Sequence, residues 1–517
     1  MNHRAWFSAV LRNTAALLLM AVSVVRGADP SEFNVRTFGA AGDGKQLDSP
    51  AIDKAINAAA SSGGGTVVVP AGTYLCGSIH LKSNIHLLLD AGATILGAPQ
   101  AMNAYDETEP WSNNAYQDGG HCYFHNSLVW GENLTNVSIT GQGLINGGGL
   151  VSSDKILDWM CGLLPQGTKA APGTATVYPP LRLGNKSIAL KLCRNVLIRD
   201  ITIVHGGHFA VLVTGCDNVT VDNVTMDTNR DGIDIDCCRN TMVSNCRINA
   251  PNDDALCPKS TYALGHNIVT ENLTITNCQV SGFQEGTLID GTMKPSPREN
   301  GRIKFGTESS GGFRNCTVSN CTFRASRGLA LEEVDGGIME NITIDNLSMM
   351  DVMHYAIYIT TGSRNRGGEV KQASTCRNIS ISNVIADGVG KEGAIQIMGT
   401  AAQPLENIRL DNIRIVSAGG GTAVDAGTSP KELGAGYPEP HGIMPAYGIY
   451  ACHVHGLEVA NLSTSFANAE LRPAGSFSDI NGLEIDHFKP QVVGGVAAAS
   501  IAKDVTGLVI RDSPLVH

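Results

Sequence analysis

Short segments in which apolar and polar residues alternate recur along most of the chain. From Asn133 onward the repeated unit is Asn, apolar, any, apolar, any, Asn, as in Asn218–Asn223 and Asn341–Asn346. Alternation with a period of two predicts β-strands, and the flanking asparagines suit turns and can stack their amides between coils. Copies that start at Asn195, Asn218 and Asn240 are spaced by 22–23 residues, the length of one coil of about three short strands. The pattern therefore predicts an all-β chain folded as a single parallel β-helix.

A different pattern occupies the segment before the repeats. Ser49 and Pro50 predict the N-cap and first turn of a short helix, and residues 63–65, all glycine, predict its end. One face of this helix is apolar, with Ile52, Ala55, Ile56 and Ala59. We expect it to cap the open end of the solenoid, whose first coil would otherwise expose apolar side chains. Strands are predicted directly afterwards at 66–69, 79–81, 85–89 and 94–95.

The first 28 residues have the pattern of a secretory signal peptide. Arg4 and Arg12 precede the apolar stretch 15–22, and Gly27 and Ala28 provide a small-residue exit. We expect cleavage near these two residues, a β-helix domain over 29–517, and a secreted or periplasmic location. No later segment reaches the roughly 18 consecutive apolar residues of a membrane span.

The amino-acid composition limits the kinds of partner that the protein can bind. The 517 residues are 43% hydrophobic and only 16% charged, as in an ordered protein, and the net charge of −11 argues against a nucleic-acid partner. An exported chain could form disulfides, but six of the 14 cysteines fall within or beside predicted strands, so we expect most of the cysteines to be buried thiols; the six are Cys193, Cys216, Cys246, Cys278, Cys316 and Cys321. No paired metal-type cysteine spacing occurs. We expect a monomer without cofactor, bound metal or membrane partner.

Two polar segments interrupt the repeats, at 101–122 and 152–180. They hold most of the aromatic residues of this part of the chain, namely Tyr105, Trp111, Tyr116, Trp159 and Tyr178. Loops on one face of a repeat protein commonly build its binding groove. We expect these loops to border a groove, with aromatics that stack on sugar rings or anchor the loops.

Two acidic clusters lie in the middle of the repeats, at 229–236 and 252–260. Asp253 follows Asp231 by 22 residues, so both clusters are expected on successive coils, with Asp231, Asp253 and Asp254 side by side. Ile233 and Ile235 should face inward, which turns the aspartates between and after them outward and leaves Asp231 exposed at a turn. Adjacent strands lie ~4.8 Å apart, close enough for like charges to split the pKa values of a pair. Glycoside hydrolysis needs such a pair, although a calcium site or a solvated acidic rim has the same pattern.

Several motifs resemble those of the polygalacturonases, glycoside hydrolase family 28. They are the acidic Asn229–Asp234 and Asp253–Asp254 followed by Lys259–Ser260, together with Pro179–Leu181 and the N-terminal stretches 38–44 and 67–74. The resemblance implies a right-handed, pectin lyase-like β-helix that is secreted and acts on pectin. It implies Asp253 as the general acid and Asp231 and Asp254 as the groups that activate water, in an inverting single displacement. Asn229 and Lys259 are then substrate-binding residues.

The chain departs from the family pattern at two motifs. The Gly-His-Gly motif, whose His supports the acid, has no copy: residues 282–286 and 300–302 are the two nearest registers, and neither contains His. Arg302 and Lys304 form an Arg-Ile-Lys triplet, which in the family binds the uronate carboxylate, yet residues 330–332 occupy the later position expected for it. We predict that Arg302 and Lys304 bind a substrate carboxylate. His208 is a further substrate-binding candidate, and it or His205 could replace the missing His.

The predicted function is hydrolysis of a galacturonate-containing pectic polysaccharide or oligosaccharide. Inversion predicts that the acid and base carboxyl groups are roughly 6.5–9.5 Å apart. Three alternatives remain: a hydrolase for rhamnogalacturonan or another glycan, a β-helix polysaccharide lyase that uses Ca²⁺ and a basic residue, and a carbohydrate-binding solenoid without activity.

Overall fold

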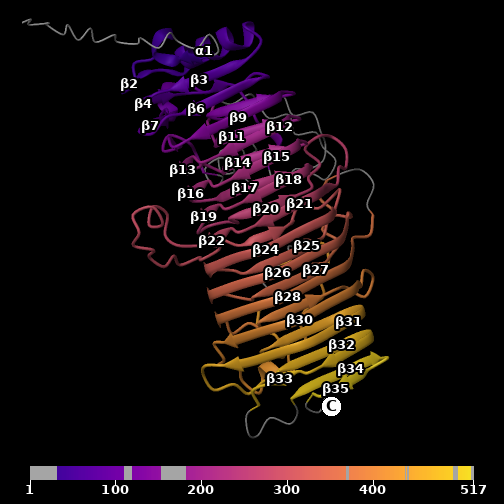
Figure 1. Cartoon of the computed structure of the whole chain (residues 1–517). Coiled ribbons are helices and arrows are strands. Elements are labelled where there is room, and N and C mark those ends of the chain that lie inside the picture. Colours follow the sequence, from indigo (N-terminus) through magenta and orange to yellow (C-terminus); the bar gives the residue numbers. More distant parts are fainter. Residues whose placement is uncertain are drawn as a thin grey trace, which may run out of the picture.

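The chain winds into a parallel β-helix whose turns stack along one axis (Figure 1). The computed structural model describes residues 32–109, 119–152, 182–367, 372–436, 438, 442–492 and 499–513. The signal-peptide prediction and the motif at 179–181 lie outside these ranges. Among the described residues, no helix is long and apolar enough to cross a membrane.

Each early turn contributes one strand to each of three stacks of parallel strands. The first stack runs through β1 (Glu32–Asn34), β3 (Gly65–Val69), β6 (Ile85–Leu89), β9 (Thr135–Gly141), β12 (Arg194–Arg199), β15 (Asp217–Asp222), β18 (Arg239–Ser244) and β21 (Thr270–Thr276). The second runs through β2 (Asp43–Leu47), β4 (Gly72–Cys76), β7 (Ala93–Gly97), β10 (Leu144–Asn146), β13 (Thr202–Val204), β16 (Thr225–Asp227), β19 (Arg247–Asn249) and β22 (Gln279–Ser281).

The third stack carries the acidic clusters. It runs through β5 (Ile79–His80), β8 (Val129–Glu132), β11 (Lys186–Lys191), β14 (Phe209–Thr214), β17 (Asp231–Asp236), β20 (Leu256–Lys259), β23 (Ile303–Phe305), β25 (Leu329–Glu333), β27 (Ile357–Thr361) and β29 (Ile395–Met398). Longer strands that bend from one stack into another complete the later turns: β24 (Phe313–Ser326), β26 (Ile338–Val352), β28 (Thr375–Val389), β30 (Leu405–Ser417), β31 (Ile449–Phe466) and β32 (Gly475–Asp486). The last strands are β33 (Lys489–Pro490), β34 (Ser500–Thr506) and β35 (Val509–Arg511).

The repeated asparagines form the ladder that their spacing predicts. The side-chain amide of Asn195 donates to Asn136 and that of Asn218 donates to Asn195, at 2.9 and 3.1 Å. These three asparagines have φ of 55–57°, the left-handed conformation that lets the chain turn between strands. Between the turns the alternating apolar side chains point inward and fill one continuous core.

The N-terminal helix α1 (Ser49–Ser61) covers one end of the solenoid, as predicted (Figure 1). Its four apolar positions are fully buried against the first turns. The predicted N-cap is wrong by one residue: Asp48 is the N-cap, and Ser49 is the first helical residue. The Asp48 carboxylate does not cap the helix because it accepts hydrogen bonds from the backbone N–H groups of Ala41 and Gly42 instead. Short 3₁₀ turns occur at η1 (Val35–Phe38), η2 (Gln100–Met102), η3 (Gly119–Cys122) and η4 (Asp425–Gly427).

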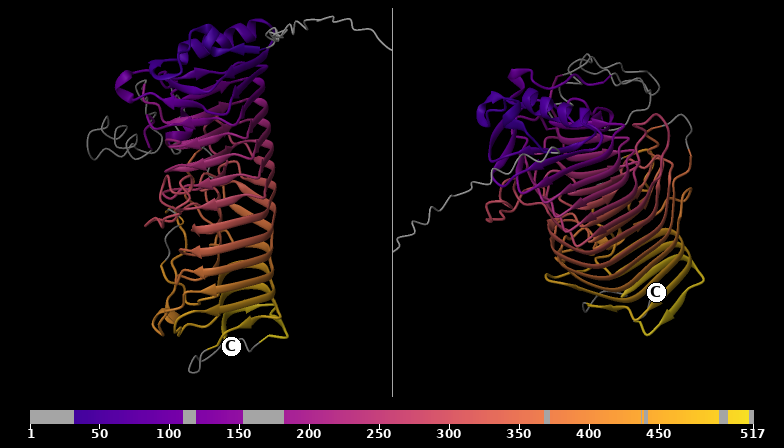
Figure 2. Two further views of the ribbon diagram at one scale, coloured as in Figure 1. Left: turned by 60° about the vertical axis from the view of Figure 1, so that its left-hand side comes forward. Right: turned by 45° about the horizontal axis from the view of Figure 1, so that its top comes forward.

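Loops project mainly from one side of the solenoid, while strands form a smooth surface elsewhere (Figure 2). Tyr105 in the first predicted loop is fully buried, and its hydroxyl donates to the carbonyl of Ala98. It therefore anchors the loop and does not stack on a sugar. The other four loop aromatics lie outside the described residues. Thirteen cysteines are buried free thiols in the part of the chain that the structure describes, as predicted.

Candidate active site

The three predicted carboxylates come together on two adjacent turns. Ile233 of β17 pairs with Leu256 of β20, and this register places Asp231 next to Asp254. One oxygen each of Asp231, Asp253 and Asp254 lies within 4.8 Å of the other two. The cluster is confirmed, but its spacing is tighter than the 6.5–9.5 Å expected between an acid and a base. The prediction that Asp231 is exposed at a turn is also wrong: the residue is only 4% exposed because it begins β17 and pairs with Phe209 of the preceding turn.

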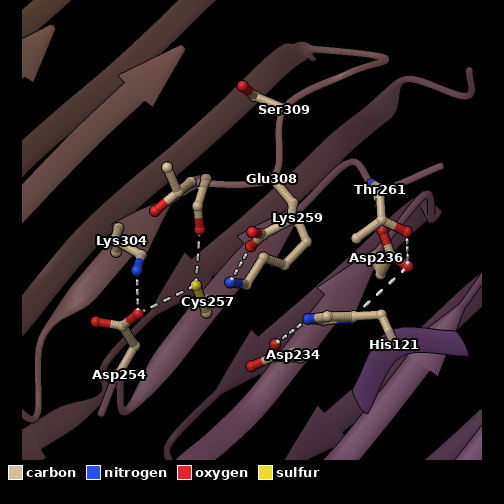
Figure 3. A network of polar contacts seen from close by, with 12 residues as sticks. His121, Asp234, Asp236, Asp254, Cys257, Lys259, Thr261, Lys304, Glu308 and Ser309 are labelled. Carbon is tan, nitrogen blue, oxygen red and sulfur yellow. Dashed lines mark hydrogen bonds and ion pairs between the residues drawn. The ribbon is translucent and has the colours of Figure 1, made fainter. Parts of the chain in front are cut away.

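Asp254 is held between two cations. Arg302 Nε lies 2.7 Å from its Oδ1 and Lys304 Nζ lies 2.6 Å from its Oδ2. These side chains flank Ile303, which is fully buried in the core, so both of them lie on the outer face of the strand stack. Figure 3 shows Lys304 pointing toward Asp254. Burial alone would raise the pKa of Asp254, but the charges of Lys304 and Arg302 hold it well below its usual range. Asp254 is therefore ionised at any pH near neutrality.

These contacts differ from the prediction that Arg302 and Lys304 bind a carboxylate of the substrate. Both side chains are about 5% exposed, and in the structure they pair with a carboxylate of the protein. Strand β23 directly follows β20 in the stack, so Arg302 stands on the coil where the resemblance to the family placed its His. On the next turn, Glu332 is buried and lies 3.9 Å from Arg302 Nη1. An acidic group thus occupies the position where the resemblance implied a cation.

Asp253 has a more open environment than its two neighbours. Its Oδ2 lies 2.5 Å from Arg230 Nη2, and the side chains of Asp253 and Arg230 are 21% and 14% exposed. Among the three carboxylates, it is the one that solvent or a substrate reaches most easily.

Asp231 is buried beside three other acids, Asp253, Asp234 and Asp254. Burial, and then the negative charge of Asp253, raises the pKa of Asp231 well above its usual range. Asp231 therefore keeps its proton to a higher pH than an ordinary aspartate, whereas Asp254 stays ionised.

His121 is the site residue that the sequence analysis missed. It lies on η3, and its Nε2 is 3.4 Å from Asp234 Oδ2 while its Nδ1 is 4.0 Å from Asp236 Oδ2 (Figure 3). His121 is fully buried against the ring of Phe209, at 4.7 Å between centroids. Burial raises the pKa of Asp234 well above its usual range. The N-terminal loop thus supplies a His to the outer face of the acidic strand.

One sequence signal could have located this His. Gly119 and Gly120 precede it, and a side chain at Gly120 would meet the rings of Phe209 and His208 at 2.6 and 2.8 Å. Glycine here permits a close approach between the loop and the strand stack. The Gly-Gly-His sequence was therefore an indication of packing against the solenoid.

Lys259 continues the polar surface beyond Asp236, its register partner on β17. Its Nζ lies 2.8 Å from Glu308 Oε2, and Glu308 Oε1 lies 3.2 Å from Arg364 Nη2. Burial would raise the pKa of Glu308, but the charges of Lys259 and Arg364 hold it well below its usual range. Lys259 is buried in this network, so its ammonium contacts protein in place of the predicted substrate.

The remaining predicted residues lie at the edge of the cluster. Asn229 donates its side-chain amide to Glu285, which also pairs with His205 at 2.9 Å. His205 lines a separate cavity of about 470 Å³ beside β10, β13 and β16. His208 is 1% exposed and packs on Phe209 at 4.0 Å between ring centroids. Asn229 thus lies near the acids because it is two residues before Asp231 in the chain. His208 lies under the η3 loop, next to Gly120.

The acidic cluster has the spacing, but not the charge, of a divalent cation site. The distances between carboxylate oxygens would suit such an ion. However, Arg230, Arg302 and Lys304 already lie against Asp253 and Asp254, and their positive charges would repel it. The donor set therefore favours acid–base chemistry on the carboxylates themselves.

Comparison with known proteins agrees with the fold. Residues 32–162 match the family described as rhamnogalacturonase A/epimerase, pectate lyase-like, and residues 186–431 match the right handed beta helix region. An exo-poly-α-D-galacturonosidase of Dickeya chrysanthemi is 24% identical over 422 residues, which cover 74% of this chain and 67% of that protein. The chain is a distant homologue of the family 28 polygalacturonases over most of its length, folded as a right-handed parallel β-helix.

Two further relatives show the range of this fold. The family 28 exopolygalacturonase of Yersinia enterocolitica superposes with a TM-score of 0.63 at 18% identity, covering 94% of this chain and 80% of that one. The plasmin and fibronectin-binding protein A of Streptococcus pneumoniae is 32% identical over 199 residues, which cover 38% of this chain and 24% of that protein. The homologues thus include both glycosidases and a binding protein.

Proposed function

We propose that this protein is an exported glycoside hydrolase that cleaves galacturonate-containing pectic polysaccharide or oligosaccharide with inversion of configuration. The observation that carries the proposal is the cluster of Asp231, Asp253 and Asp254, in which Asp253 is the most accessible carboxyl group and Asp254 is held as a carboxylate by Arg302 and Lys304. The names of the homologues support the substrate class. Residues 1–28 would be removed on export, and residues 29–517 would act as a monomer without cofactor.

In the proposed reaction, Asp253 is the general acid. It protonates the glycosidic oxygen as the bond from this oxygen to the anomeric carbon breaks. A water molecule attacks the anomeric carbon from the opposite face, and Asp231 takes its proton while passing its own proton to the ionised Asp254. The products are two saturated saccharides, and one water is consumed. General acid catalysis of this kind contributes about 10²–10⁴-fold in rate.

The surroundings of Asp254 support a single displacement over a covalent one. A carboxylate nucleophile must bring a free oxygen to the anomeric carbon. Both oxygens of Asp254 are paired with buried cations, and the side chain is fully buried. Asp254 can polarise a water molecule through its charge, but it cannot reach a sugar. The burial of Asp254 therefore favours inversion although the carboxyl groups are closer than the usual inverting spacing.

A second candidate is a carbohydrate-binding solenoid without turnover. It is favoured by Arg302 at the position of the family His and by the similarity to the streptococcal binding protein. The sequence alternatives of a rhamnogalacturonan hydrolase and a polysaccharide lyase differ in substrate and in product, so one assay separates all four.

The test is product release from polygalacturonate, rhamnogalacturonan and their oligomers by the intact enzyme and by Asp253→Asn, each with and without EDTA. We expect saturated products from polygalacturonate, retained in EDTA and reduced about 10²–10⁴-fold in the variant. Unsaturated products that need a metal would identify a lyase. Binding without products would identify a binding solenoid, and full activity of Asp253→Asn would reject the assigned acid.

A further inference from the structure

The cations around the cluster differ in how firmly they are held. Lys259, Arg302 and Lys304 are 8%, 5% and 5% exposed, and each pairs with a carboxylate that is at most 5% exposed. Arg230 is 14% exposed and pairs with Asp253, which is 21% exposed. The Arg230–Asp253 pair is therefore the most accessible of these ion pairs.

This difference decides which cation can change its partner. When a buried cation leaves its carboxylate, the carboxylate stays behind as an unpaired charge where water cannot hydrate it. This is strongly unfavourable. A partly exposed pair is weakened by solvent, and its members can be hydrated when they separate. Of these four cations, Arg230 alone can leave its carboxylate for a ligand at small cost.

The position of Arg230 also suits a substrate. It lies between Asn229 and Asp231 in the chain, at the start of β17, and its guanidinium reaches the carboxylate proposed as the acid. A guanidinium binds a carboxylate through two parallel hydrogen bonds, so it suits a uronate better than a neutral sugar. The triplet that the family uses for this task is occupied here, because Arg302 and Lys304 pair with Asp254.

We propose that Arg230 binds the carboxylate of the uronate at the cleavage site and thereby releases Asp253 to serve as the acid. In this exchange the substrate carboxylate replaces Asp253 on Arg230. Asp253 then lies beside the negative charges of Asp254 and of the substrate without its own cation, and repulsion between like charges favours uptake of a proton from solvent. Recognition of a uronate and readiness of the acid are thus one event, and a neutral sugar cannot trigger it. The inference rests on the proposed function and adds the residue that sets its specificity.

The experiment compares kcat/KM on trigalacturonate and on its fully methyl-esterified form, which removes the negative charges. The variants are Arg230→Gln and Arg230→Lys. Arg194→Gln is the matched control, since Arg194 is 62% exposed on β12 and lies 3.9 Å from Asp217. Thermal melting of each variant shows whether it is folded.

We expect the wild-type enzyme to prefer the acid over the ester by about 30-fold, the size of a charge-assisted hydrogen-bonded contact. Arg230→Gln should reduce this preference to about 3-fold or less. Arg230→Lys should give an intermediate preference because it keeps the charge. The control Arg194→Gln should leave the preference unchanged. Hydrolysis by the wild type with an unchanged preference in both Arg230 variants overturns the inference and leaves the proposed function intact. If Arg230→Gln does not fold, an unchanged, wild-type preference for the acid in Arg230→Lys likewise overturns the inference. No hydrolysis of either substrate by the wild type overturns the proposed function and the inference with it.

Discussion

Replacing Asp254 with Asn tests the ion-pair arrangement at the centre of the site. The change is nearly isosteric, but it removes the only carboxylate that lies within 2.7 Å of both Arg302 and Lys304 in the described part of the chain. Both cations then lose the negative charge of Asp254, while Arg302 keeps its hydrogen bond to the Tyr355 hydroxyl. Losing one partner of a buried ion pair costs about 3–5 kcal/mol. Because the amide oxygen still accepts one hydrogen bond, we expect a loss of about 3 kcal/mol in the free energy of unfolding.

The measurement is urea unfolding followed by circular dichroism, with midpoints and slopes compared between variants. Asp217→Asn is the matched control, because Asp217 is 21% exposed and its two arginine partners are more than half exposed. Exposed pairs contribute about 0–1 kcal/mol, so this control should lose little stability. The double variant Asp254→Asn, Lys304→Met should recover about 1–3 kcal/mol relative to the sum of the single changes, since only one buried cation then lacks the charge of Asp254. Equal losses in Asp254→Asn and Asp217→Asn would refute the reasoning.

Two further predictions concern His121 and Asp231. His121→Ala should lower kcat about 10-fold with little change in KM, because His121 orients Asp234 from the loop side. The control is His125→Ala on the same loop, where His125 pairs with Glu132. Equal kinetics of the two variants would contradict the role of His121. Asp231→Asn should abolish turnover and raise the melting temperature by about 1–3 °C at pH 7 but not at pH 4. The native state keeps the proton of Asp231 while the unfolded chain loses it above pH about 4, so stability falls as pH rises through that window; a stabilisation that is equal at both pH values would contradict it.

The sequence predicted the fold well because a β-helix is built from local rules. Alternation places Ile233 and Ile235 in the core, and the asparagine spacing gives the ladder from Asn136 to Asn218. Each coil packs on the next, so the interval from Asp231 to Asp253 sufficed to predict their contact. The N-cap of the capping helix was predicted one residue too late, because the Asp48 carboxylate accepts hydrogen bonds from the preceding loop and does not cap the helix.

The partners of the acidic residues could not be predicted from spacing in the same way. His121 reaches Asp234 across more than a hundred residues, from a loop without a repeat pattern. Arg302 and Lys304 were correctly expected on the outer face, but whether they meet a substrate or Asp254 depends on the long insertion before β23, which alternation does not describe. Sequence patterns thus located the charged side chains, and only the packing of loops and turns shows which of them compensate one another.

The most direct test of the account follows hydrolysis of trigalacturonate by proton NMR and identifies the anomer that appears first. The α-linkage named for the Dickeya relative sets the starting configuration of the proposed substrate. With Asp254 buried and paired on both oxygens, the account predicts that the β-anomer forms first and that Asp253→Asn forms neither at a comparable rate. Initial release of the α-anomer would require a covalent intermediate on a carboxylate and would contradict the single displacement proposed for this cluster.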